Sequence, residues 1–152
     1  MSTDRIEKRI ELKAPVARVW RALADHQQFG AWFRAKLEEP FAPGKLVRGQ
    51  ITYPGYEHLK VAMLVVEMVP ERLFSFRWHP NAVDANVDYS QDPQTLVEFR
   101  LEPSAVGTLL RLTESGFDQF PAGPRRDEAF RGNEGGWTEQ MKNIERHVRE
   151  SP

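Results

Sequence analysis

The sequence predicts an α+β protein in which one long carboxy-terminal helix packs against a curved antiparallel sheet of six or seven strands. Segments with alternating apolar and polar residues fill most of the chain from residue 45 to residue 115. Apolar residues at helical spacing follow near the end of the chain, at Trp137, Met141, Ile144 and Val148. Strands that succeed one another without an intervening helix pair antiparallel, and a single helix then covers one face of their sheet.

The amino-terminal part of the chain predicts one strand followed by two short helices. Residues 5–12 alternate between apolar and charged side chains, which is typical of a strand with one buried face. Pro15 then stands where the first turn of a helix tolerates proline. The spacing of apolar residues predicts a helix over about 15–25 and a shorter one over about 26–33.

The middle of the chain predicts the remaining strands of the sheet. Proline and glycine residues separate the alternating segments, as turn signals do. The predicted strands lie over 36–39, 45–53, 60–69, 72–79, 95–102 and 107–115, and the last two form a hairpin. Residues 80–94 form a polar connection between strands, and loops of that length are usually functional or mobile.

Three glycines fall at the beginning of the predicted last helix, at Gly132, Gly135 and Gly136. Each costs roughly 0.5–1 kcal/mol of helix stability relative to alanine. They favour a break, with the main helix beginning near residue 134. A close approach of the helix backbone to the sheet or to a ligand is the second interpretation. Either one makes the start of this helix soft, as an adjustable lid over a pocket requires.

Composition limits the classes of function. The 152 residues carry 21 Lys and Arg against 22 Asp and Glu, so the net charge of −1 gives no general attraction to nucleic acid. The absence of cysteine excludes disulfides, thiolate catalysis and cysteine-bound metals. No apolar segment resembles a signal peptide or a membrane span. We expect a soluble, cytoplasmic, single domain over residues 1–152, with no nucleic-acid partner and no membrane insertion.

The sequence predicts neither a metal site nor a cofactor. The four histidines do not occur at metal-binding spacing. Asp84, Asn86 and Asp88 imitate the start of a calcium loop, but Tyr89 and Thr95 occupy the positions where that loop needs glycine and glutamate. Phosphate-cradling and dinucleotide-binding motifs are absent from the sequence as well.

Glu114 is the main candidate for acid–base chemistry. It is in register with Leu110 and Leu112 on the predicted strand, so it points inward if the leucines do. It would then lie at the end of a cavity, beside Phe117. The alternative is an exposed glutamate at the end of a strand, or the partner of a neighbouring arginine. No residue is assigned a catalytic role.

Three segments resemble a known superfamily. The opening, with Ala14-Pro15, Val19-Trp20 and Trp32-Phe33, resembles the first strand and helix pair of the START-like, Bet-v-1-type helix-grip superfamily (SRPBCC). The ending, Gly136 to Ile144, resembles its carboxy-terminal helix. The segment Glu67 to Leu73 is similar to one branch, the bacterial relatives of the activator of the heat-shock-protein-90 ATPase.

The resemblance implies a sheet that grips the last helix, with a hydrophobic cavity between them. We expect the cavity to bind a small apolar or amphipathic molecule without catalysis. The expected lining is Trp20, Trp32, Phe33, Met63, Phe76, Trp78, His79, Phe99, Glu114, Phe117, Trp137, Met141 and Ile144.

Two other functions stay open. One is a co-chaperone-like domain that modulates a chaperone ATPase, as the family branch suggests for a stress-response protein. The other is a small cyclase, isomerase or hydrolase that uses polar residues of the cavity. The protein is expected to be a monomer or a homodimer.

Overall fold

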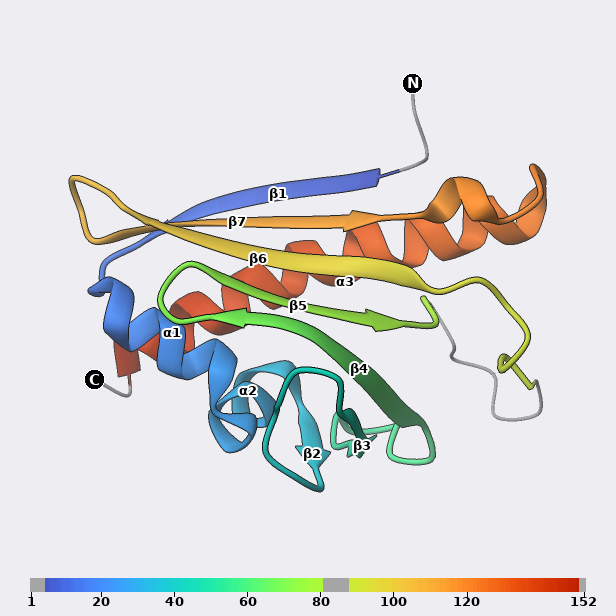
Figure 1. The fold of residues 1–152 in the computed structure, drawn as a ribbon, viewed down its shortest axis with the longest axis horizontal. Coiled ribbons are helices and arrows are strands. Elements are labelled where there is room, and N and C mark those ends of the chain that lie inside the picture. Colours follow the sequence, from blue (N-terminus) through green and yellow to red (C-terminus); the bar gives the residue numbers. More distant parts are fainter. Residues whose placement is uncertain (1–4, 81–87, 151–152) are drawn as a thin grey trace.

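The computed structural model describes residues 5–80 and 88–150 and confirms the predicted α+β architecture (Figure 1). The elements in chain order are β1 (Arg5–Leu12), α1 (Val16–Ala24), α2 (His26–Phe33), β2 (Ala35–Leu37), β3 (Leu46–Ile51), β4 (Lys60–Val69), β5 (Leu73–Trp78), β6 (Thr95–Pro103), β7 (Thr108–Ser115), the 3-10 turn η1 (Phe117–Gln119) and α3 (Pro124–Glu150). Part of the predicted 80–94 connection, including Asp84 and Asn86 of the calcium-like motif, lies outside the described residues.

The strands form one seven-stranded antiparallel sheet in the order β1-β7-β6-β5-β4-β3-β2. Strands β2 to β7 follow one another as neighbours, and β1 pairs with β7. Helix α3 runs along one face of the sheet (Figure 1). Helices α1 and α2 lie near the carboxy-terminal end of α3 (Figure 1). This arrangement leaves the space between α3 and the sheet as the place for the core.

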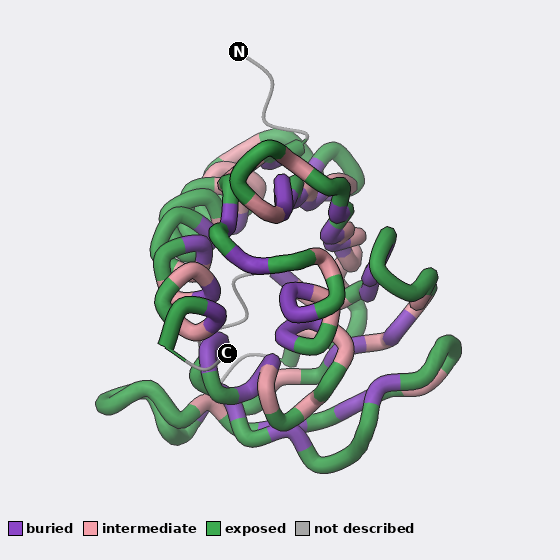
Figure 2. Tube along the Cα trace, turned by 90° about the vertical axis from the view of Figure 1, so that its left-hand side faces the viewer, coloured by how far each residue is buried: buried purple, intermediate pink, exposed green. Residues whose placement is uncertain are grey.

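Aromatic side chains fill the middle of that space. Fully buried phenylalanines there are Phe29, Phe74, Phe76 and Phe99, while the fully buried Phe117 lies near the start of α3. The ring centroids of Phe29 and Trp32 lie 4.7 Å apart, and those of Phe99 and Trp137 lie 5.7 Å apart, which are distances of direct packing. Buried and exposed segments alternate along α3 and the strands (Figure 2), as expected for elements with one buried face.

Helix α3 is longer than the sequence predicts. It begins at Pro124 and continues through the glycine segment 132–136, so the predicted break near residue 134 is wrong. Tertiary contacts override the low helix propensity of glycine. Phe130, just before the glycines, packs edge-on against Phe117 with ring centroids 5.4 Å apart. No helix within the described ranges combines the length and apolar character that a membrane span requires.

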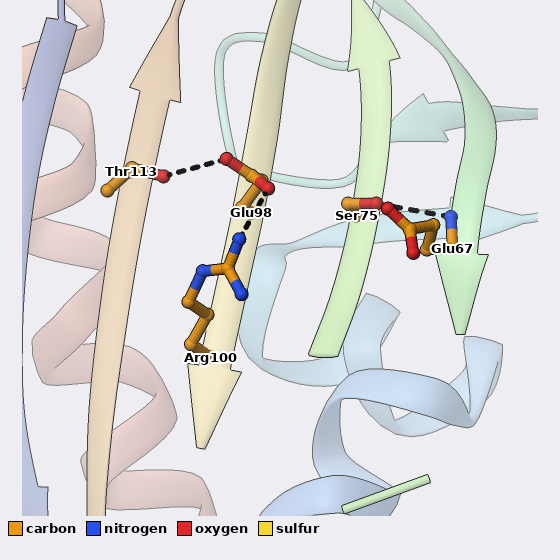
Figure 3. A network of polar contacts seen from close by, with 5 residues as sticks. All are labelled: Glu67, Ser75, Glu98, Arg100 and Thr113. Atoms are coloured by element: carbon orange, nitrogen blue, oxygen red, sulfur yellow. Dashed lines mark hydrogen bonds and ion pairs between the residues drawn. The ribbon is translucent and has the colours of Figure 1, made fainter. Parts of the chain in front are cut away.

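The face of the sheet away from α3 carries a network of polar contacts (Figure 3). There Thr113 of β7 donates to Glu98 of β6 at 3.4 Å, and Arg100 forms a 2.9 Å ion pair with the same carboxylate. The backbone N–H of Glu67 donates to the Ser75 hydroxyl at 3.1 Å, beside a bulge in β4. Glu98 is thus an ordinary outer-face carboxylate, paired with an exposed arginine.

Candidate functional site

Strand β4 pairs with β5 only along its second half, and we call the unpaired part the division between β4 and β5. Strand β4 pairs with β3 over Lys60–Leu64 but with β5 only from Leu64, which lies opposite Arg77. Strand β5 continues to Trp78, which pairs on its other side with Thr95 of β6. Figure 1 shows the amino-terminal end of β4 curving away from the end of β5. In the part of the chain that the structure describes, the first half of β4 therefore has no partner strand on its β5 side.

A pocket of about 540 Å³ occupies the division between the strands. It is lined by Phe33, Arg34, Ile51, Tyr53, Tyr56, Leu59, Lys60, Val61, Ala62, Trp78, His79, Tyr89, Gly132, Asn133, Gly136, Glu139, Gln140 and Asn143. Two larger hollows, of about 860 and 780 Å³, have no phenylalanine, tyrosine or tryptophan among the described residues that line them. The 540 Å³ pocket differs from them in its aromatic walls.

Two tyrosines of the β3–β4 connection stand at the pocket. The side chains of Tyr53 and Tyr56 are each 51% exposed, and their ring centroids lie 5.7 Å apart. Gly55, with a φ of 92°, makes the turn between them. The guanidinium of Arg34 lies 5.8 Å from the Tyr53 ring centroid, within cation–π distance. An aromatic pair this exposed offers apolar surface to a ligand.

The wall opposite the tyrosines is the glycine-containing part of α3. Gly132 and Gly136, one helical turn apart, both line the pocket. A Cβ atom added at Gly136 would meet no atom within 4 Å, and the same is true at Gly135, which does not line the pocket. Glycine at 136 therefore serves open space rather than close helix packing. One turn further, the Gln140 amide donates to the Phe33 carbonyl at 3.0 Å and ties α3 to α2.

Glu114 lies behind the pocket, fully buried, and accepts hydrogen bonds from four side chains. The indole Nε1 of Trp137 donates to Oε1 and that of Trp78 donates to Oε2, each at 2.8 Å. Asn133 Nδ2 donates to both oxygens, at 2.9 and 3.0 Å, and the Thr95 hydroxyl donates to Oε2. Within the described ranges no ion pair reaches Glu114, so uncharged donors solvate it.

This arrangement gives Glu114 a structural role. Indole N–H and amide NH₂ groups can only donate, which suits a carboxylate that can only accept. The donors come from β5, β6 and α3, so one buried group on β7 fixes the start of the helix to the sheet. Because Trp78 and Asn133 also line the pocket, Glu114 holds two parts of its wall in place. Both oxygens are already occupied by protein donors.

The structure distributes the residues expected to line a cavity over four places. Phe33, Trp78 and His79 line the pocket. The closed core contains Trp32, Met63, Phe76, Phe99, Phe117, Trp137, Met141 and Ile144. Trp20 is half-buried on α1 and packs against that core, and Glu114 lies between the core and the pocket wall. Among the described residues no cluster of three metal-binding side chains occurs.

Two groups of pocket residues were not predicted from the sequence. One is in the β3–β4 connection and includes Tyr53 and Tyr56, and the other is the amide side chains of α3, such as Gln140. The available signal was two tyrosines around a glycine turn, an unusual amount of aromatic surface for a solvent loop. The spacing of Gly132 and Gly136 was a second signal, because four residues place both on one helical face.

The chain matches one protein family in sequence and several solved structures in fold. Residues 13–149 match the family described as Activator of Hsp90 ATPase homolog 1-like protein. A protein from Mesorhizobium loti is 23% identical over 97% of this chain and 98% of its own, with a TM-score of 0.76. A protein from Arthrobacter aurescens is 20% identical over 97% of this chain and 87% of its own, also at 0.76.

The Aha1 dimer from Colwellia psychrerythraea is 16% identical over 95% of each chain, with a TM-score of 0.69. At these identities the solved structures show likeness of fold alone. No curated protein matches the chain. The family match covers most of the sequence and confirms the resemblance predicted above: this chain, with its helix-grip fold, belongs to the Activator of Hsp90 ATPase homolog 1-like family.

Proposed function

We propose that this protein binds a small apolar or amphipathic molecule in the pocket between the start of α3 and the divided edge of β4 and β5. The observation that carries the proposal is the pocket itself, whose volume of about 540 Å³ suits a small organic molecule. Its walls include Phe33, Trp78 and the exposed rings of Tyr53 and Tyr56. Aromatic walls with a few convergent polar groups are the usual composition of such sites.

Apolar burial supplies the driving force for this binding. Covering apolar surface contributes roughly 25 cal/mol per Å² removed from water. The Tyr53 and Tyr56 rings are held at the site by a tight turn and by their mutual contact, so little conformational entropy is lost when a ligand covers them. The same rings in the free protein are the most exposed large apolar side chains among the described residues.

Two matched glycine variants test the proposal. Gly136→Met places a flexible side chain in the pocket, whereas Gly135→Met places it one residue away, outside the lining. Both positions have room for the new side chain, and both exchanges raise helix propensity by roughly 0.5–1 kcal/mol. We expect the fluorescent probe N-phenyl-1-naphthylamine to bind wild type and Gly135→Met alike and Gly136→Met at least tenfold more weakly. Equal binding by all three proteins, or none by wild type, would overturn the proposal.

A co-chaperone activity is the second candidate, and the family match over residues 13–149 favours it. Stimulation of the ATPase rate of a purified Hsp90-type chaperone by this protein would support this activity. The Gly136→Met variant separates the two functions, because a surface interaction does not require an empty pocket. Loss of stimulation in that variant would connect chaperone binding to the ligand site.

A further inference from the structure

The edge of β4 that faces the pocket carries backbone groups without a strand partner. The N–H of Ile51 donates to the Leu59 carbonyl and that of Val65 donates to the Lys45 carbonyl, so odd-numbered residues of this segment bond toward β3. In an antiparallel ladder the backbone groups of successive residues point to opposite edges. Ala62 therefore directs its N–H and C=O toward β5, where pairing begins only at Leu64.

The opposing edge at the end of β5 is incomplete in the same way. Continuing the β4–β5 register would bring His79 opposite Ala62, but pairing stops before this point. Within the described ranges no backbone hydrogen bond joins these two residues. The side chain of His79 adds a buried Nδ1 that has no hydrogen-bond partner in the described part of the chain. Ala62 and His79 both line the pocket.

This explains why Ala62 lines an aromatic pocket although its side chain points away from the core. It alternates with Val61 and Met63, whose side chains face inward. The part of Ala62 that reaches the pocket is its backbone edge. A ligand that only filled the pocket with hydrocarbon would shield these backbone groups from water without replacing their hydrogen bonds, which weakens its binding.

We infer that the pocket selects molecules in which a secondary amide lies within an aromatic or apolar body, the amide pairing with the backbone edges at Ala62 and His79. The inference rests on the proposed function and specifies its ligand class. A trans secondary amide directs its N–H and its C=O to opposite sides. It therefore offers a donor to one edge and an acceptor to the other, as an added strand does. The aromatic body lies against Trp78 and the two tyrosines.

Two nearly isosteric probes test the ligand class by calorimetry. N-(2-naphthyl)acetamide carries the amide N–H, and 2-naphthyl acetate has an ester oxygen in its place. We expect the amide to bind about tenfold more tightly, since the ester leaves a protein acceptor unpaired. Equal affinities would overturn this inference and leave the proposed function intact. Failure of both probes, together with failure of N-phenyl-1-naphthylamine, would overturn the proposed function as well.

Amide hydrogen exchange locates the bond without any substitution. In the free protein we expect the Ala62 N–H to exchange at least a hundredfold faster than the Met63 N–H, which bonds to β3. Saturation with N-(2-naphthyl)acetamide should slow exchange at Ala62 or His79 and leave Met63 unchanged. Protection of Ala62 equal to that of Met63 in the free protein, or no slowing at either pocket residue with the probe bound, would contradict the inference.

Discussion

The middle of the space between α3 and the sheet is closed by packed side chains, whereas the end beside the division of β4 from β5 is open. In the middle, buried rings such as Phe29 and Phe99 pack against one another and leave no surface exposed. At the division of β4 from β5, rings of the same chemical kind stay open, and Tyr53 and Tyr56 remain half-exposed around a pocket of about 540 Å³. Strand pairing accounts for this difference. Where neighbouring strands pair continuously, their inward side chains pack against one another, and where β4 does not pair with β5 they do not.

Glu114 lies at the border between these regions and shows how the border is held. Its carboxylate binds Trp137 of the closed core and Trp78 of the pocket wall. Asn133 connects the same group to the glycine-containing part of α3. An uncharged shell of donors thus keeps the wall rigid while the space beside it stays open.

Removing a ring from the closed region should damage the fold most. Phe99→Ala is expected to lower the free energy of unfolding by about 3–5 kcal/mol, because its ring is fully buried among other aromatic rings. Urea denaturation followed by tryptophan fluorescence measures this. A loss below about 1 kcal/mol would show that the middle of the molecule is loosely packed and would remove the contrast between the two regions.

Removing the border carboxylate should come next. Glu114→Ala leaves the buried indole donor of Trp137 unsatisfied and removes the partner of the part-buried Trp78 indole, and we expect a loss of about 2–4 kcal/mol in the free energy of unfolding. Glu98→Ala on the outer face is the matched control, and its loss should stay within about 1 kcal/mol. Equal effects of the two substitutions in urea denaturation would contradict the role assigned to Glu114.

The pocket rings should affect binding rather than stability. Tyr56→Ala is expected to change the free energy of unfolding by less than about 0.5 kcal/mol, because its side chain is 51% exposed. The affinity for N-phenyl-1-naphthylamine should fall several-fold, since one wall of the pocket is lost. A variant with full probe affinity would place the bound probe elsewhere on the molecule.

The smallest effect concerns pH and lies at the opposite end of α3. Burial, with a contribution from the nearby Arg18 guanidinium, lowers the pKa of His147. The unfolded chain therefore takes up this proton first as the pH falls below about 6.5, and stability decreases until the folded-state pKa is passed. His147→Gln should flatten the pH dependence of the unfolding free energy in this window. An unchanged slope would contradict the prediction.

The sequence was informative where the deciding interactions are local. Period-two alternation predicted the strands and placed Glu114 in register with Leu110 and Leu112, but it left open whether that face points inward, as the structure has it. The beginning of α3 was not predictable, because Phe117 and Glu114 hold its glycine segment from other elements. The pocket depends on where β4 stops pairing with β5, a long-range register that no residue in either strand specifies alone.

The most direct test of the open end is a ¹H–¹⁵N NMR titration with N-phenyl-1-naphthylamine that follows the indole N–H signals of the four tryptophans. Trp78 lines the pocket, Trp32 donates to the Ala22 carbonyl inside the core, and Trp20 lies on α1. We predict a large, saturable shift of the Trp78 signal and none for Trp32 or Trp20. Shifts centred on Trp32 or Trp20, or no saturable shift at Trp78, would show that the probe does not bind in this pocket.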